Sequence, residues 1–205
     1  DKREMDFVNS YTPYPADNDS DWKGSSGISN ICCNSGDKEI YFLHDGGLWC
    51  LDMATENGNL SCRWNTELAD GNFTNPVYAN GRVYVGNLKG TAVITSTRSG
   101  NIFCYDANSG IKLWEHSAAD HVMSAPIVYP KGSHNYIYYT TVEYSGNYYD
   151  HTYYCRAYCI EDEDSGAAPV WDMTLAENPK GSPYNMAASG EYIVFYRGGE
   201  LYIVK

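Results

Sequence analysis

The sequence lacks long apolar runs and has few basic residues. No stretch approaches the roughly 18 consecutive apolar residues that a helix needs to cross a bilayer. Lysine and arginine number 14 against 26 aspartate and glutamate residues, which gives a formal net charge of −12 at pH 7. A nucleic-acid surface needs clustered positive charge to displace counterions. We therefore expect neither a transmembrane helix nor a nucleic-acid partner.

Familiar catalytic and metal-binding patterns are also missing. There is no G-x-S-x-G, P-loop or Rossmann pattern, and the five histidines have no regular metal spacing. His116 and His121 flank one loop, which leaves a weak metal site as an open alternative. The run at 17–21 has the D-x-D-x-D spacing of a calcium loop, but Trp22 stands where glycine is needed and Ile28 where glutamate belongs. We predict no catalytic residue, no metal and no cofactor.

A chain of 205 residues can bury a core as one domain. It opens on Asp1, so the lack of a signal peptide says nothing about export. Its 20 tyrosines, 19 glycines and acidic balance suit an exported or cell-surface protein, and we expect an extracellular or envelope location.

One stretch organises the rest: Gly100–Trp114, which reads GNIFCYDANSGIKLW. Ile102, Cys104 and Asp106 alternate with Phe103 and Tyr105, the period-2 pattern of a strand with two environments. Asp106 to Gly110 has turn chemistry, because Asp and Ser side chains bind nearby backbone and glycine accepts a positive φ. A second strand returns through Trp114. This pattern predicts a β-hairpin.

Weaker copies lie on both sides of this hairpin. Residues 47–64 repeat the order with Cys50, Asp52 and a longer turn before Trp64, and residues 158–171 repeat it around Cys159. Each copy follows a further strand–turn–strand segment. A period near 50 residues made only of strands predicts a β-propeller of four-stranded antiparallel blades. We expect about four, at 28–68, 75–118, 125–175 and 186–205.

The clean copy, Cys104-x-Asp106-x-x-Ser109-Gly110-x-x-x-Trp114, resembles the tryptophan-docking repeat of quinoprotein-type (PQQ-like) β-propellers, with Cys in place of Ala. The resemblance implies that each tryptophan packs between neighbouring blades and that the Asp-to-Gly turn holds the hairpin. It implies the fold rather than the quinone cofactor. The structural positions that it marks are Trp22, Trp64, Trp114, Trp171, Asp52, Asp106 and Gly110.

The fourth unit has only three expected strands and no tryptophan of its own. A strand near 20–24, with Trp22, could complete it and remove an open sheet edge. Three arrangements follow: a ring closed by one chain, a dimer that exchanges terminal strands, or part of a larger propeller. We rank them in that order.

Seven cysteines cannot form a complete internal disulfide framework. Cys50, Cys104 and Cys159 fill the small-residue position on separate blades, so we expect buried free thiols. Cys50 with Cys62 is the one plausible pair. The quinoprotein family carries a vicinal disulfide beside its cofactor, but Cys32 and Cys33 lie in a strand pattern, and we interpret them as strand residues.

The segment Glu143–Tyr154 does not belong to the repeat and is rich in Tyr, Ser, Gly and Asn, a composition typical of binding loops. A long twisted hairpin that covers neighbouring blades is the alternative. Its candidate binding residues are Tyr144, Tyr148, Tyr149, His151, Tyr153 and Tyr154.

Composition and repeat together favour a non-catalytic binding or scaffold propeller of the cell surface, which holds a protein partner through loops on one face. Two alternatives stay open. One is a carbohydrate-binding module that uses Tyr148, Tyr149, Tyr153 and Tyr154. The other is a fragment of a quinone-dependent oxidoreductase.

Overall fold

The computed structural model describes residues 31–34, 36–44, 46–53, 60–68, 72–88, 99–122, 124–146, 151–177, 185–189, 192–197 and 200–204. This part of the chain contains strands and turns, with no helix and hence no helical segment of a length and hydropathy that could cross a membrane. The predicted strand near 20–24, with Trp22, lies outside the described residues.

The strands form four antiparallel sheets, numbered here in chain order. Sheet one consists of β1 (Cys32–Asn34), β2 (Glu39–His44), β3 (Gly47–Asp52) and β4 (Ser61–Glu67). Sheet two consists of β5 (Asn72–Phe73), β6 (Val77–Ala79), β7 (Arg82–Leu88), β8 (Gly100–Asp106) and β9 (Lys112–Ala118). Both β5 and β6 pair with β7, so the two short strands share one edge.

Sheet three consists of β10 (Ile127–Lys131), β11 (His134–Gly146), β12 (His151–Glu163) and β13 (Gly166–Glu177). Sheet four has three described strands, β14 (Asn185–Ser189), β15 (Tyr192–Arg197) and β16 (Glu200–Val204). Within each sheet the strands follow one another in chain order, apart from the shared edge of sheet two.

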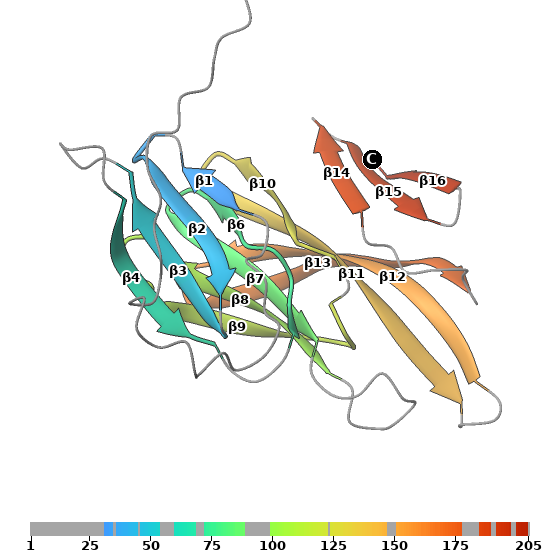
Figure 1. The fold of residues 1–205 in the computed structure, drawn as a ribbon. Coiled ribbons are helices and arrows are strands. Elements are labelled where there is room, and N and C mark those ends of the chain that lie inside the picture. The colour runs from blue at the N-terminus through green and yellow to red at the C-terminus, as the bar shows by residue number, and fades with distance from the viewer. Residues whose placement is uncertain are drawn as a thin grey trace, which may run out of the picture.

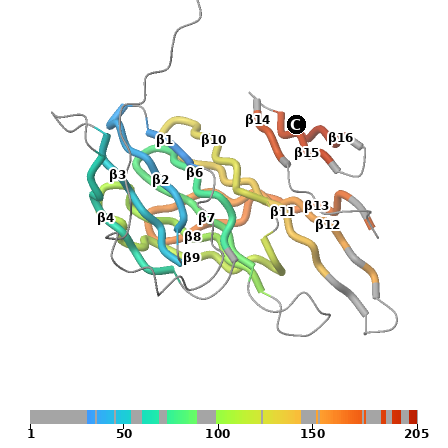
Figure 2. The backbone as a smooth tube through the Cα atoms, in the orientation of Figure 1, coloured from blue at the N-terminus to red at the C-terminus, as the bar shows by residue number. Residues whose placement is uncertain are grey.

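The first strands of the sheets lie next to one another, because β1 packs beside β6, β6 beside β10 and β10 beside β14. Figure 1 shows the sheets fanning out from this inner row, and the tube in Figure 2 follows the same path from blue to red. Consecutive antiparallel sheets arranged about a common inner row are blades of a β-propeller. The fold expected from the repeat is therefore confirmed.

Each of the first three sheets carries the same cross-strand row. The rows are Tyr41–Cys50–Trp64, Tyr84–Cys104–Trp114 and Tyr138–Cys159–Trp171. In all three, the pairing with the last strand shifts register directly after the cysteine. A bulge bends and twists its strand, so the three sheets carry the same local distortion at the same place.

The core is divided into three layers, one between each pair of neighbouring sheets. Tyr41, Leu48, Cys50 and Trp64 of sheet one pack against sheet two. The opposite face of sheet two, which includes Cys104 and Trp114, packs against sheet three. Sheet three in turn packs against Ile193 and Phe195 of sheet four. Each tryptophan-bearing face thus covers the next sheet along the chain.

The cysteines follow the small-residue expectation. Cys50, Cys104 and Cys159 are buried free thiols, as predicted. The alternative of a Cys50–Cys62 disulfide is wrong, because Cys62 lies opposite Leu51 and is exposed while both thiols are free. Cys32 and Cys33 are free strand residues of β1.

Sheet three is longer than its neighbours. β11 and β12 each have 13 residues, against seven in β7 and β8. They stay paired from Asn135–Asp162 out to Gly146–His151. Most of the segment 143–154 is therefore strand. Its described backbone follows the alternative of a long hairpin rather than that of a loop. Residues 147–150, with Tyr148 and Tyr149, lie outside the described residues.

Candidate functional site

The docking of Trp64 shows how the repeat joins two sheets. Its indole Nε1 donates a hydrogen bond of 2.8 Å to the carbonyl oxygen of Ala107, in the turn between β8 and β9. Asp106 holds that turn, because its carboxylate accepts from both the backbone N–H and the hydroxyl of Ser109. The N–H of Gly110 donates to the Asp106 carbonyl at 2.9 Å. The implied roles of this turn and of Trp64 are present here.

Asp52 occupies the matching position at the end of β3, opposite Glu39 and Ser61. The turn that follows it includes residues 54–59, which the structure does not describe. Its role as a turn former therefore stays a prediction.

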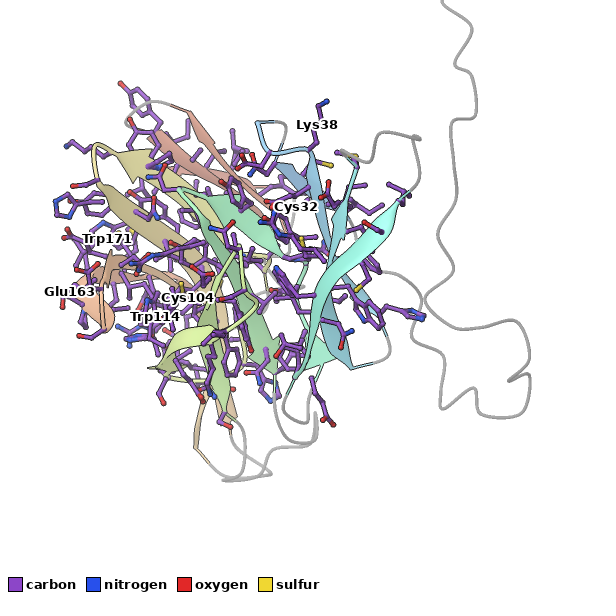
Figure 3. All side chains as sticks on the ribbon, turned by 90° about the vertical axis from the view of Figure 1, so that its left-hand side faces the viewer. Cys32, Lys38, Cys104, Trp114, Glu163 and Trp171 are labelled. Atoms are coloured by element: carbon purple, nitrogen blue, oxygen red, sulfur yellow. The ribbon has the colours of Figure 1, made fainter. Side chains whose placement is uncertain are left out.

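Trp114 docks on the third sheet in a different way. Its Nε1 donates to Oδ1 of Asp162 at 2.7 Å, and Arg82 and the Tyr84 hydroxyl donate to the same buried carboxylate. Asn135 closes the network by donating to the Tyr84 hydroxyl at 2.7 Å. Figure 3 shows Trp114 close to Cys104, with Glu163 at the rim. Three donors balance the buried negative charge of Asp162.

Asp162 was missed by reasoning from the repeat, which pointed to Glu161 as the counterpart of Asp106. Glu161 instead pairs with His134 at 2.6 Å. Asp162 stands one residue further on, where sheet two has Ala107. Ala107 and Asp162 thus occupy the same position of the repeat, and each accepts the hydrogen bond of the tryptophan from the preceding sheet. Ala107 accepts with its backbone carbonyl, whereas Asp162 accepts with its side-chain carboxylate.

Trp171 completes the series on sheet three. It packs in the layer with Ala157, Ile193 and Phe195, and its ring lies 5.9 Å from that of Tyr138. The matching aromatic distances are 6.0 Å for Tyr41–Trp64 and 6.1 Å for Tyr84–Trp114. The contact between the tyrosine and the tryptophan of the row is therefore repeated in all three sheets.

The feature that sets sheet three apart is its outer part, which we call the third-sheet extension: residues 140–146, 151–157 and 172–177. Figure 1 shows β11 and β12 running well past the other sheets. One face carries a charged network. Arg156 pairs with Asp172 and lies 3.6 Å from Glu143 (Nη1 to Oε2). Glu143 also accepts from the hydroxyls of Thr141, at 3.1 Å, and Tyr158.

Aromatic rings support this network from the side of the core. Tyr158 stacks on the buried Tyr139 with ring centroids 5.1 Å apart, and the Arg156 guanidinium lies 5.6 Å from the Tyr158 centroid. Burial, together with the hydrogen bond to Glu143 and its charge, raises the pKa of Tyr158 to about 12. The hydroxyl therefore stays protonated near neutral pH and remains a donor. The Tyr158 ring thus contacts both Tyr139 and Arg156.

Four of the six predicted binding residues, Tyr144, His151, Tyr153 and Tyr154, lie on the backbone of β11 and β12. Tyr154 pairs with Glu143 and is half-buried, in register with the charged network. Tyr144 pairs with Tyr153, one step along. His151 pairs with Gly146 at the outer end.

Two features of the described residues concern metal and thiol chemistry: the placement of metal-ligating side chains and the position of the Cys32 thiol. Within it, no three His, Cys, Asp or Glu side chains gather as metal ligands would. Cys32 accepts a hydrogen bond of 3.1 Å from the backbone N–H of Tyr78 on sheet two, and burial raises the pKa of its thiol. This thiol lies at the boundary between two sheets.

No protein-family model matches the chain, and no curated protein matches it. Solved structures do. BamB from Moraxella catarrhalis has 18% sequence identity and a TM-score of 0.51, over 86% of this chain and 45% of the BamB chain. The quinohemoprotein alcohol dehydrogenase ADHIIG from Pseudomonas putida HK5 has 14% identity and a TM-score of 0.45, over 81% of this chain and 29% of that one.

The AfRom2 CNH domain has 11% identity and a TM-score of 0.36, over 88% of this chain and 71% of that one. The chain spans less than half of the length of BamB. Since these identities are low, the similarity concerns the fold. With the sheet order and the repeated rows, it establishes that this chain folds as an all-β propeller of the kind seen in BamB.

Proposed function

We propose that this protein is an exported, non-catalytic binding propeller, and that its third-sheet extension holds a protein partner. The observation that carries the proposal is the length of β11, β12 and β13, which have 12 or 13 residues where the corresponding strands of sheets one and two have six or seven. Part of the added length packs against sheet four, through Ala157 and Leu175, and the rest runs on past the other sheets (Figure 1).

The extension is pre-organised for binding. Its strands are paired along their full described length, and Arg156 is held by Glu143, Asp172 and the Tyr158 ring. A surface that is ordered before binding loses little conformational entropy on association. Tyrosine near such a surface adds contact area at a small entropic cost, and Tyr154 supplies it here.

The charges indicate the chemistry of the partner. The described part of this surface carries one cation, Arg156, and three acidic residues: Glu143, Asp172 and the exposed Glu177. The chain as a whole is acidic. We therefore expect a partner that offers lysine or arginine, since complementary charge favours encounter and correct orientation.

A protein partner is favoured over a glycan by the state of the described tyrosines. Sugars stack on free aromatic faces, but Tyr139 is buried and the Tyr158 ring already contacts both Tyr139 and the Arg156 guanidinium. A glycan site would have to rest on Tyr154 with Tyr148, Tyr149 and Tyr153 at the outer end of the hairpin.

The test places a photo-crosslinking phenylalanine analogue at Tyr154, with Tyr136 as the matched control. Tyr136 is also half-buried and lies at the other end of β11, away from the extension. In envelope extract from the source cells, we expect a protein adduct from position 154 that weakens at high salt and is absent from position 136. Equal adducts from both positions, or none, would contradict the proposal.

The two alternatives have their own readouts. Glycan-array binding that is lost in the Tyr148→Ala/Tyr149→Ala variant would replace the protein partner with a carbohydrate. Dye reduction after addition of pyrroloquinoline quinone and Ca²⁺ would replace binding with oxidation. We expect neither signal.

A further inference from the structure

In sheet four, two apolar positions of β16 are exposed to solvent, although the equivalent positions of the other sheets are buried. In sheet two, Val83 and Val85 face sheet one, and Tyr84 between them faces sheet three. In sheet four, Ile193 and Phe195 face sheet three. Val194 therefore occupies the position of Tyr84, and its β16 partner Ile203 occupies that of Cys104.

The exposure of this position differs sharply between sheets. Ile203 is 62% exposed, whereas Cys50, Cys104 and Cys159 are at most 1% exposed. Two residues earlier, Leu201 is 61% exposed, and its counterparts Leu48, Ile102 and Ala157 are all at 0%. In sheets one to three, the last strand with its tryptophan and the next sheet cover these positions. Both covers are missing from the described part of sheet four.

The chemistry of the missing strand follows from the rows. A strand that pairs with β16 should place a tryptophan opposite Ile203, as Trp64 and Trp114 stand opposite Cys50 and Cys104. Its neighbours should be polar, because in β4 and β9 the tryptophan is buried between exposed residues such as Arg63, Asn65 and Glu115.

Trp22 meets both requirements. It stands in Ser-Asp-Trp-Lys-Gly, with polar neighbours on either side. It precedes Cys32 by ten residues, while Trp64 precedes Val77, and Trp114 precedes Ile127, by thirteen. Cys32, Val77 and Ile127 are equivalent, since each pairs with the tyrosine of its row. Trp22 thus precedes sheet one in the same order as the other two tryptophans precede their following sheets, with a connection three residues shorter.

We propose that two copies of this chain associate head to tail, with the strand around Trp22 of each copy added to β16 of the other, opposite Ile203. Among the described strands, β14 packs beside β10 but has no comparable packing with β1, and Figure 1 shows sheets one and four on different sides of the fan. A strand that leads into sheet one therefore reaches a neighbouring copy. Four sheets covering 45% of the BamB chain also fit half of a larger ring.

The two associations are identical and close on themselves about a twofold axis, so no edge is left to continue a filament. Each contact also places sheet one of one copy over the exposed face of sheet four of the other, which covers Leu201, Ile203 and Tyr196. Main-chain pairing supplies affinity and the indole supplies register, as in other cases of strand addition.

The register gives a direct test by disulfide formation. In sheets one and two, Leu48 pairs with Thr66 and Ile102 with His116, two residues beyond the tryptophan. By the same count Gly24 should meet Leu201. In a Cys33→Ser/Cys62→Ser background, one chain carries Gly24→Cys and a second carries Leu201→Cys. On mixing and oxidation we expect a linked pair of chains, and at least tenfold less product when Leu113→Cys, on β9, replaces Leu201→Cys.

Solution mass gives the second readout. We expect sedimentation equilibrium of the full chain to report two chains, and Trp22→Ala to weaken association at least about thirtyfold, as for a central tryptophan at an interface. A one-chain mass would overturn the proposal. So would a disulfide that forms only when Gly24→Cys and Leu201→Cys are on the same chain, which would mean that the chain closes on itself. Equal linkage with the Leu113→Cys control would also overturn it.

Discussion

The ring of Trp64 lies directly against Gly110 of the neighbouring sheet. A β-carbon added at Gly110 would stand 2.6 Å from Cε3 and 2.7 Å from Cδ2 of Trp64. The φ angle of Gly110 is also +71°, which side chains of L-residues rarely adopt. The glycine of the repeat therefore serves two purposes, since it permits the turn and leaves room for the indole of another sheet.

Gly110→Ala should destabilise the protein by about 2–4 kcal/mol, because it adds backbone strain to a steric clash with buried atoms. Equilibrium urea unfolding followed by tryptophan fluorescence measures the change. Gly132→Ala is the matched control. Gly132 has a φ of +65° and no atom within 4 Å of its added β-carbon, so it reports the strain alone, about 1 kcal/mol. Equal losses at the two positions would refute the clash.

Trp114→Phe should cost about 1 kcal/mol more than Trp64→Phe. Both changes remove one indole N–H from a sheet interface, but Trp114 donates to the charged Asp162 and Trp64 to the neutral carbonyl of Ala107. Hydrogen bonds to charged groups contribute about twice as much as neutral ones. Urea unfolding of the two variants gives the difference. A larger loss for Trp64→Phe would show that packing, rather than the acceptor, sets the contribution of these indoles.

Thiol labelling should divide the cysteines by position. Cys33 and Cys62 are exposed, whereas Cys50 and Cys159 are buried between strands. Burial raises the pKa of Cys50 to about 12 and that of Cys159 to about 11. Only the thiolate reacts, so these two should stay protonated and unlabelled at pH 8.

Time-resolved alkylation followed by peptide mass spectrometry should find Cys33 and Cys62 modified first. The four buried thiols, Cys50, Cys104, Cys155 and Cys159, should react only after urea is added. The Cys33→Ser/Cys62→Ser variant is the control and should lose the rapid phase. Rapid labelling of Cys50 or Cys159 in the folded protein would contradict the packing of the rows.

Stability should fall steadily as the pH rises above about 9. The folded state raises the pKa of Cys50 to about 12, of Cys159 to about 11 and of Tyr105 to about 12, in each case mainly through burial. The unfolded chain releases these protons at the lower ordinary values, so the folded state binds more protons. The stabilisation is therefore complete below about pH 8.5 and is lost as the pH approaches 12.

Urea midpoints at half-unit steps from pH 8 to 11 would measure this loss. The Cys50→Ala/Cys159→Ala variant lacks two of the groups, and its midpoint should decline less steeply over the same range. A midpoint that stays level up to pH 11 in the unmodified protein would show that these groups are accessible to solvent.

Most of the fold could be predicted from the repeat. Its cysteine and tryptophan positions locate two strands of each of the first three sheets and the indole contact between sheets, because small and very large residues that recur at a fixed spacing fill equivalent places in successive sheets. The tyrosines of the rows, Tyr41, Tyr84 and Tyr138, were not recognised as a set. With 20 tyrosines in the chain, no single one stands out by type.

Asp162 escaped prediction for another reason. The residue after the repeat aspartate can accept the indole hydrogen bond with its backbone carbonyl or with its side chain. A residue of any type can use its carbonyl, so the position has no fixed residue type. A sequence comparison that follows residue identity therefore passes over it. The length of β11 and β12 was visible only as a tyrosine-rich insertion, since nothing local separates a loop from a pair of strands that continue outward.

The indoles of Trp64 and Trp114 each reach forward along the chain to the following sheet. The part of the sequence that could be duplicated without breaking a contact is therefore not one sheet but the interval from one docking tryptophan to the next, as from Asn65 to Trp114. Gene duplication of that interval would enlarge the propeller. Each new copy would already contain the site that binds the indole of the preceding copy.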